Sequence, residues 1–299
     1  MITNIKHTSM MMTKTLSLRL FGLLLLFAAG AVSTDAKKFR IMSFNIRLLT
    51  TADGDNIWTN RSDAVCKFIG KTAPDVFGVQ EATKVQMDDL SKNLPDYAYV
   101  GVGRDDGKEA GEYSPVFYRK DKFKLIKSGT FWLSETPDKP SLGWDAACRR
   151  VCSWTLLQNV KTGNSFVYAN THLDHVGEKA RVNGAMLIKE RLSRIANNLP
   201  MLITGDFNVT SSSPAYSTML NRIFALQDAY KNAKKRKGLK SSFNNWGKIA
   251  DDKGNIIDFV FASPFLKAKK ACLHDGNLGN GHYLSDHNAL YVDFDGKEL

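Results

Sequence analysis

A carboxylate and a carboxamide stand two positions apart behind a short apolar run near the middle of the chain. The run, 201–203, follows a proline, ends before a Thr-Gly pair, and leads to Asp206 and Asn208. It predicts a buried strand that opens onto a loop. Because residues i and i+2 of extended chain face the same side, the two polar groups would project together. They could hold a phosphate ester beside a divalent cation, whereas a turn closed by an Asx hydrogen bond is the plainer interpretation.

Chemically similar groups stand at or beside the ends of five other apolar runs. They are Asn45, Glu81, His172, Asp258, and the pair of Asp286 and His287. Taken one at a time, several of these residues could simply cap a strand or a helix end. An ionised Asp258 inside the run 256–261 needs a partner, however, because burying a lone charge is costly. Chance hardly produces all six clusters. Carboxylate and carboxamide oxygens suit Mg²⁺ or Mn²⁺, and two imidazoles without cysteine suit proton transfer better than zinc binding.

Short strands with a few helices between them must position these groups. We expect a helix over 62–71 and an amphipathic helix over 178–198, whose apolar residues recur at spacings of three and four. No solenoid repeat and no linker of low complexity interrupts the chain, so one catalytic domain over 37–299 is the economical organisation. The strand-like runs are 39–46, 75–81, 97–103, 111–119, 123–132, 151–160, 165–171, 201–203, 256–261 and 289–294.

The first 36 residues differ in kind from the rest. Lys14 and Arg19 precede the apolar segment 20–32, and small residues follow up to Ala36. This order predicts a secretory signal peptide over residues 1–36, with an uncleaved anchor as the alternative. The apolar segment is short for a membrane span. We therefore expect export to the periplasm or the extracellular space, with no stable membrane insertion after cleavage.

The chain is strongly basic, with a formal net charge of +11 over 299 residues. Much of the excess lies in the run 231–240, which has no interleaved aromatic residues to stack on bases. A solvated loop is the plain interpretation of this run. A surface that attracts polyanions is the other interpretation.

Four cysteines, at positions 66, 148, 152 and 272, are dispersed through the chain without zinc-ribbon spacing. Buried free thiols are one interpretation. In an oxidising compartment one or two disulfides are the other, and Cys148 with Cys152 is the nearest pair.

Six short motifs occur in the order in which the endonuclease/exonuclease/phosphatase superfamily carries them, and the chain resembles that superfamily. They read Ser-Phe-Asn-Ile (43–46), Gly-Val-Gln-Glu (78–81), Asn-Thr-His-Leu (170–173), Gly-Asp-Phe-Asn (205–208), Ile-Asp-Phe (257–259) and Ser-Asp-His (285–287). The resemblance implies an α/β (α+β) fold, a four-layer sandwich in which two mixed β-sheets pack face to face with helices on the outside. It also implies a site at one rim of the sheets.

The resemblance implies a metal site and a water-activating group. Asn45 and Glu81 would hold a Mg²⁺ or Mn²⁺ ion, with Asp286 near it. Asp206 would activate or orient the attacking water, and Asn208 would grip the phosphate or help to place Asp206.

The resemblance implies two further catalytic groups. His287, oriented by Asp258, would contact the scissile phosphate, and His172 would be a second imidazole supported by Glu112. Which imidazole donates a proton and which accepts one stays open.

Three more residues are expected to bind substrate: Asn170, Arg150 and Arg181. The two arginines could clamp a phosphate, although surface arginines usually do not. Together with Trp144 and the stretch 174–181, they resemble a group of secreted bacterial members of unsettled substrate.

The chain departs from the superfamily pattern at two positions. Arg47 stands where some nucleases carry an additional acid, which makes a second cation doubtful. Ile256 stands where many relatives have arginine, so one phosphate contact would be missing.

Two functions fit these observations. The first is a secreted, divalent-metal-dependent phosphoesterase that hydrolyses a phosphodiester or a phosphomonoester by in-line attack of water. The basic run slightly favours nucleic acid over phospholipid, inositol phosphate or sugar phosphate as its substrate. The second is a non-catalytic module on the same scaffold that binds polyanions. The sequence indicates no protein partner.

Overall fold

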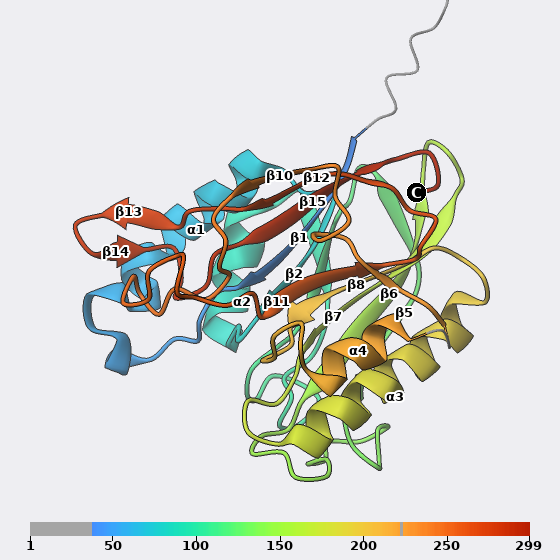
Figure 1. Cartoon of the computed structure of the whole chain (residues 1–299), viewed down its shortest axis with the longest axis horizontal. Coiled ribbons are helices and arrows are strands. Elements are labelled where there is room, and N and C mark those ends of the chain that lie inside the picture. The colour runs from blue at the N-terminus through green and yellow to red at the C-terminus, as the bar shows by residue number, and fades with distance from the viewer. Residues whose placement is uncertain (1–37, 222–223) are drawn as a thin grey trace, which may run out of the picture. The chain divides into compact units, whose positions relative to one another are not determined.

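The computed structural model describes residues 38–221 and 224–299 (Figure 1). The expected signal peptide over 1–36 lies outside these residues. Among the helices of the described part, none combines the length and the apolar character that crossing a membrane requires.

Most described strands belong to two mixed β-sheets. One has the strand order β10-β12-β15-β1-β2-β4-β3 and the other β5-β6-β7-β8-β11-β9, while β13 and β14 form a separate pair. The elements are β1 (Lys38–Asn45), η1 (Thr51–Asn56), α1 (Trp58–Thr72), β2 (Val76–Gln80), α2 (Lys84–Asn93), β3 (Tyr97–Val100), β4 (Val116–Arg119), β5 (Phe123–Trp132), β6 (Val151–Asn159), β7 (Ser165–His172), α3 (Glu178–Ala196), β8 (Met201–Asp206), α4 (Pro214–Leu220), β9 (Gln227–Asp228), β10 (Lys235–Gly238), β11 (Asp258–Ala262), β12 (Ala268–Leu273), β13 (Asn277–Gly279), β14 (His282–Tyr283) and β15 (Leu290–Asp295).

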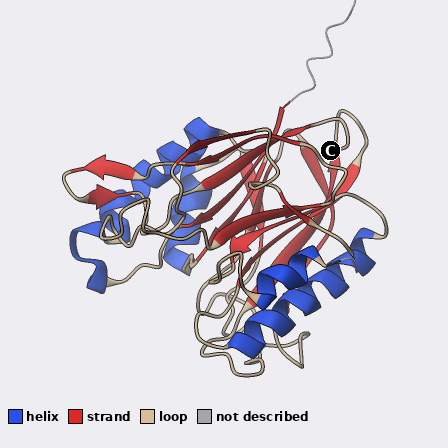
Figure 2. Ribbon diagram, in the orientation of Figure 1, coloured by secondary structure: helices blue, strands red, loops and turns tan. Residues whose placement is uncertain are grey.

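Three apolar clusters separate four layers. One cluster lies between the two sheets, and it includes Phe39, Phe166 and Val292. A second joins the six-stranded sheet to α3 and α4, and a third joins the seven-stranded sheet to α1 and α2. Figure 2 shows the strands between the two helical layers. The predicted four-layer sandwich is confirmed.

The inward faces of the strands change from apolar to polar toward one end of the sandwich. Alternate residues of a strand share a face, so each inward row can be read directly from the sequence. These rows carry polar groups where they approach the loops at that end. The rows are Phe39, Ile41, Ser43 and Asn45 in β1, Phe166, Tyr168, Asn170 and His172 in β7, and Leu202, Thr204 and Asp206 in β8.

Three sequence-based expectations of the elements need correction. The first helix begins at Trp58 rather than at 62, because Trp58 and Arg61 extend its buried stripe. The run 111–119 is a strand only over 116–119, since Gly111 has a φ of 81° and Pro115 cannot donate to a ladder. The basic run is not wholly a loop, because β10 pairs in parallel with the outer edge of β12.

All four cysteines are free thiols. Cys66, Cys152 and Cys272 are buried, and Cys148 is half-buried. Burial raises the pKa of the Cys66 thiol to about 11. The interpretation as free thiols therefore fits the structure, and the alternative pairing of Cys148 with Cys152 is not formed.

Asn170 ties the two sheets together. Its Nδ2 donates to the carbonyl oxygens of Val79 and Pro115 at 2.7 and 3.0 Å, and its Oδ1 accepts from Gln80 and Thr204 at 2.6 and 3.0 Å. The side chain is fully buried, and every polar atom of it is hydrogen-bonded. The expectation that Asn170 binds substrate is therefore wrong, because these bonds leave it no group to offer.

Gly78 provides the space that Asn170 occupies, since a Cβ at position 78 would overlap the Asn170 side chain. We expect Gly78→Ala to lower the free energy of unfolding by about 1–3 kcal/mol, as overpacked cores do. Urea denaturation followed by circular dichroism measures this change. Gly70→Ala is the matched control, because Gly70 lies in α1, where an added Cβ would make only an ordinary contact with Leu94 at 4.0 Å, and this variant should gain stability. Equal stability of Gly78→Ala and the parent protein would show that the sheets adapt without cost.

Candidate active site

The polar ends of the strands meet where the chain leaves the sheets through tight turns. Asn45, His172 and Asp206 are the last residues of β1, β7 and β8. Glu81 and Asn208 follow β2 and β8 with positive φ angles of 63° and 50°. Asparagine tolerates left-handed backbone, but this conformation is costly for a residue such as Glu81, and it concentrates at functional sites. Both side chains line the same cavity.

Asn45 connects acidic residues that come from the two sheets. Its Nδ2 donates to Oε1 of Glu81 and to Oδ2 of Asp206, each at 3.0 Å. Burial opposes the ionisation of Glu81, but the hydrogen bond from Asn45 and the charge of His287 hold its pKa below the usual value. Glu81 is therefore an ionised carboxylate at the centre of the site.

Arg47 lies between the two carboxylates expected at the cation site. Its guanidinium is 3.7 Å from Oε2 of Glu81 and 4.0 Å from Oδ2 of Asp286, and it is also paired with Asp53 at 3.0 Å. The oxygens of Asn45, Glu81 and Asp286 are hard donors of the kind that Mg²⁺ and Mn²⁺ prefer. The chemistry of these donors suits one divalent ion, and the guanidinium between the two carboxylates disfavours a second.

The structure brings Asp258 and His287 together as a buried pair. Oδ2 of Asp258 lies 2.9 Å from Nδ1 of His287, and Nε2 of His287 lies 3.7 Å from Asp206. The register of β11 and β8 places Asp258 opposite Asp206. Burial and the charge of Asp258 raise the pKa of Asp206. The imidazole is thus fixed by one carboxylate and faces another across the cavity.

His172 lies near the same carboxylate oxygen of Asp206 as His287 does. Its Nε2 is 2.9 Å from Nδ2 of Asn208 and 3.5 Å from Asp206. Its Nδ1 is 3.9 Å from Glu112, which accepts a 2.7 Å hydrogen bond from Arg104 instead. Glu112 therefore lies close to His172 but forms no hydrogen bond with it, because its carboxylate accepts one from the guanidinium of Arg104. The expected support of His172 by Glu112 is limited to this proximity.

The two imidazoles have opposite electrostatic surroundings. Burial and the positive charges of Arg150 and Arg104 hold the pKa of His172 well below its usual value. Burial also disfavours the charge on His287, but the carboxylates of Asp258 and Asp206 outweigh it and hold the pKa of His287 well above the usual value. Such divergence separates acid and base roles at one pH. His287 is therefore suited to carry a proton, and His172 is suited to act as a neutral imidazole.

Arg150 is held from behind and faces the cavity. Its Nε donates to Oδ1 of Asp174 at 3.3 Å, and its Nη2 lies 3.0 Å from Nδ1 of His175. Its Nη1 is buried and finds no partner in the described part of the chain. Arg150 is also a lining residue of the cavity, where a guanidinium is suited to bind an anionic oxygen.

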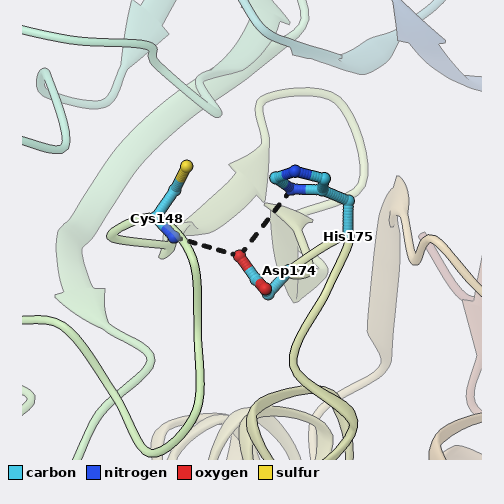
Figure 3. A group of neighbouring side chains, drawn as sticks. All are labelled: Cys148, Asp174 and His175. Carbon is cyan, nitrogen blue, oxygen red and sulfur yellow. Dashed lines mark hydrogen bonds and ion pairs between the residues drawn. The ribbon is translucent and has the colours of Figure 1, made fainter.

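Cys148, Asp174 and His175 have the donor types of a metal site, and Figure 3 shows them grouped around the Asp174 carboxylate. Arg150, however, already contacts both Asp174 and His175, so a cation would have to displace a guanidinium. Asp174 also accepts hydrogen bonds from the backbone N–H groups of Ala147, Cys148, Val176 and Gly177. We conclude that this group positions Arg150 rather than a metal ion.

Arg181, which was expected to bind substrate, does not line the cavity. Its Nη1 donates to the carbonyl oxygen of Asp174 at 3.1 Å, so it supports the turn that holds Arg150. Of the three expected substrate ligands, only Arg150 faces the cavity.

Arg61, which is 2% exposed, was not predicted to support the site. It shares the buried stripe of α1 with Trp58 and Val65, and that spacing of three and four was the available signal. Its guanidinium donates to the backbone carbonyls of Ile46, Arg47, Asn56 and Leu284. These bonds join the turn after β1 to the segment that carries Asp286.

The cavity that these residues enclose has a volume of about 400 Å³. Acidic and imidazole groups line it together with three arginines. Its lining residues are Arg47, Leu48, Glu81, Arg104, Glu112, Cys148, Arg150, His172, His175, Asp206, Asn208, Phe243, Ile257, Asp286 and His287.

Comparison with known proteins decides the family. The model of the endonuclease/exonuclease/phosphatase family matches residues 42–287. The chain belongs to this family. Its members are phosphate-ester hydrolases, so the chain is an enzyme of that class, as the sequence predicts.

Solved structures and curated proteins include several similar chains. The endonuclease/exonuclease/phosphatase from Bacteroides vulgatus is 42% identical, with a TM-score of 0.83 over 86% of this chain and 98% of that one. A mannosyl-6-phosphatase from Bacteroides thetaiotaomicron is 35% identical, with a TM-score of 0.78 over 86% and 99%. Nocturnin from Drosophila melanogaster is 25% identical over 80% of this chain and 42% of its own length.

Proposed function

We propose that this enzyme hydrolyses a small phosphate ester, and we favour a sugar phosphate, with one Mg²⁺ or Mn²⁺ ion bound by Asn45, Glu81 and Asp286. The observation that carries the proposal is the single cavity in which these donors meet Asp206, the two imidazoles and Arg150. A bound ion would stabilise negative charge on the phosphoryl oxygens and on the leaving oxygen.

The protein groups divide the remaining work. The carboxylate of Asp206, which burial makes more basic, accepts a proton from the attacking water and orients it. The imidazolium of His287 faces the position of the phosphoryl group and donates a hydrogen bond there. The neutral His172, held by Asn208 at 2.9 Å, contacts the same group. Arg150, which lines the cavity, contributes its guanidinium to a phosphoryl oxygen.

The position of the basic run argues against nucleic acid as the substrate. β10 pairs with β12, which pairs with β15, so three strand spacings separate β10 from β1. Through these strand pairings, Lys235 lies level with Lys270, Asp293 and Arg40. In β1, Arg40 stands five residues before Asn45. That offset is about 16 Å along the strands. Lys235 therefore lies toward the far end of the sheet, and no residue of the run 231–240 lines the cavity.

The similarity to the mannosyl-6-phosphatase supports a sugar phosphate as the substrate, because the two chains are 35% identical over 99% of the phosphatase and 86% of this chain. All the expected metal and imidazole positions are present, which disfavours a non-catalytic polyanion-binding module. If residues 1–36 direct export, as the sequence predicts, the enzyme meets its substrate outside the cytoplasm.

A substrate panel tests the proposal. The purified protein is incubated with hexose 6-phosphates, nucleoside monophosphates, plasmid DNA, RNA and phospholipid vesicles, with Mg²⁺, with Mn²⁺ or with EDTA. We expect the hexose phosphates to release inorganic phosphate fastest, and we expect EDTA to remove the activity. Asp206→Asn is the inactive control. Faster cleavage of DNA or RNA would overturn the sugar phosphate assignment, and activity that persists in EDTA would overturn the metal requirement.

A further inference from the structure

A second cleft lies beside the catalytic cavity and shares part of its wall. Its volume is about 560 Å³, and Arg47, Phe243 and Asp286 line both spaces. Residues that line the second cleft but not the catalytic cavity include Trp246, Asn245 and Lys248. A substrate whose phosphoryl group reaches Asp286 can therefore extend its alcohol part into this cleft.

The loop 242–249 that forms the cleft is fastened to the catalytic residues. The N–H groups of Asn244 and Asn245 both donate to the carbonyl oxygen of Asp286, at 2.9 and 3.1 Å. The rings of Phe243 and His287 lie 5.0 Å apart, and the two residues form an isolated β-bridge. Whatever occupies the cleft is thus held at a fixed position relative to His287.

The backbone of this loop is strained where the aromatic side chain is presented. Asn245 and Trp246 have consecutive positive φ angles of 48° and 57°. Asparagine tolerates this region, but a bulky tryptophan rarely adopts it, and such strain concentrates at functional sites. The conformation directs Trp246 to the cleft, with the guanidinium of Arg61 5.3 Å from its ring centroid.

The groups in the cleft match the surface of a sugar ring. An indole and a phenyl ring offer flat apolar faces for the C–H face of a pyranose. Within residues 38–221 and 224–299, the carboxamide of Asn245 and the ammonium of Lys248 form neither a hydrogen bond nor an ion pair, so both are free to bind hydroxyl groups. Resting on the function proposed above, we propose that this cleft binds the pyranose ring of the sugar phosphate and that Trp246 determines specificity for it.

Kinetics of Trp246 variants test this inference. With hexose 6-phosphates, we expect Trp246→Ala to raise KM about tenfold with kcat nearly unchanged, and Trp246→Phe to retain most of the affinity. With glycerol phosphate, which has no ring, Trp246→Ala should behave like the parent protein. Phe265→Ala is the matched control, because Phe265 is an exposed aromatic residue in the β11–β12 loop at the opposite end of the sandwich.

Binding to an inactive protein gives a second measurement. In the Asp206→Asn background, Trp246→Ala should weaken the calorimetric Kd for a hexose 6-phosphate about tenfold and leave the Kd for inorganic phosphate unchanged. Equal losses for ring-containing and ring-free ligands, or tighter binding of nucleoside monophosphates than of hexose phosphates, would overturn the inference while the hydrolase assignment stood. Absence of hydrolysis and of binding of any hexose phosphate by the parent protein would overturn the proposed function, and this inference with it.

Discussion

Glu81→Gln is expected to lower kcat/KM by about 10²–10³-fold at a subsaturating concentration of Mg²⁺. Glu81 is the ionised carboxylate at the centre of the site, where Asn45 and the Leu48 N–H donate to its two oxygens at 3.0 and 3.1 Å. The amide that replaces it keeps the shape and can still accept a hydrogen bond, but it removes the negative charge from the expected ion site. The guanidinium of Arg47, which lies 3.7 Å from Glu81, would then repel a divalent cation more strongly, because one negative charge that offsets its positive charge has been removed.

The cause of this loss is separable from a folding defect. A titration of activity with Mg²⁺ should show a shift to higher metal concentration in Glu81→Gln, and thermal melting without metal should show little change. Mg²⁺ should raise the Tm of the parent protein more than that of the variant, because only ligand that binds the native state stabilises it. Glu109→Gln is a matched control, since Glu109 is an exposed carboxylate outside the cavity. An unchanged metal titration in Glu81→Gln would remove Glu81 from the ion site.

The sequence was most informative where the period of a strand decides which side chains point inward. Asn45 continues the inward row of Phe39 and Ile41, and Asp206 continues that of Leu202. Because side chains alternate between the two faces of a strand, the sequence predicts that Asn45 and Asp206 point inward. The cost of burying a lone charge also required a partner for Asp258 before its neighbour in space was known. Local pattern and elementary energetics are enough to predict both features.

The same patterns could not separate a cavity ligand from a structural bond. Asn170 occupies an inward row as Asn45 does, yet its amide joins β7 to the backbone of the opposite sheet. Glu112 likewise lies near His172, but Arg104 competes for it. The first outcome depends on groups from remote parts of the chain. The second depends on how the loop between Arg104 and Glu112 folds back on itself, which the spacing of residue types does not predict.

The paired burial of Asp258 and His287 leads to the second large prediction. We expect His287→Asn to lower kcat by about 10²–10⁴-fold, the usual contribution of a positioned proton donor. Asp258→Asn should lower kcat by a similar order, because His287 loses the partner 2.9 Å away that orients its ring. Since both changes disable one unit, the double variant should be little slower than His287→Asn alone. Multiplicative losses of kcat would show that the two residues act independently.

Stability should respond in the opposite order, and this contrast distinguishes the pair from two unrelated catalytic groups. His287→Asn leaves the Asp258 carboxylate, which is 1% exposed, without its cationic partner. Removing one member of a buried ion pair costs about 3–5 kcal/mol, whereas replacing both members costs much less. Adding Asp258→Asn to His287→Asn should therefore recover part of the lost free energy of unfolding, measured by urea denaturation, while activity stays low. A double variant that is less stable than His287→Asn would show that Asp258 is held by other groups, and the orientation of His287 would then need another cause.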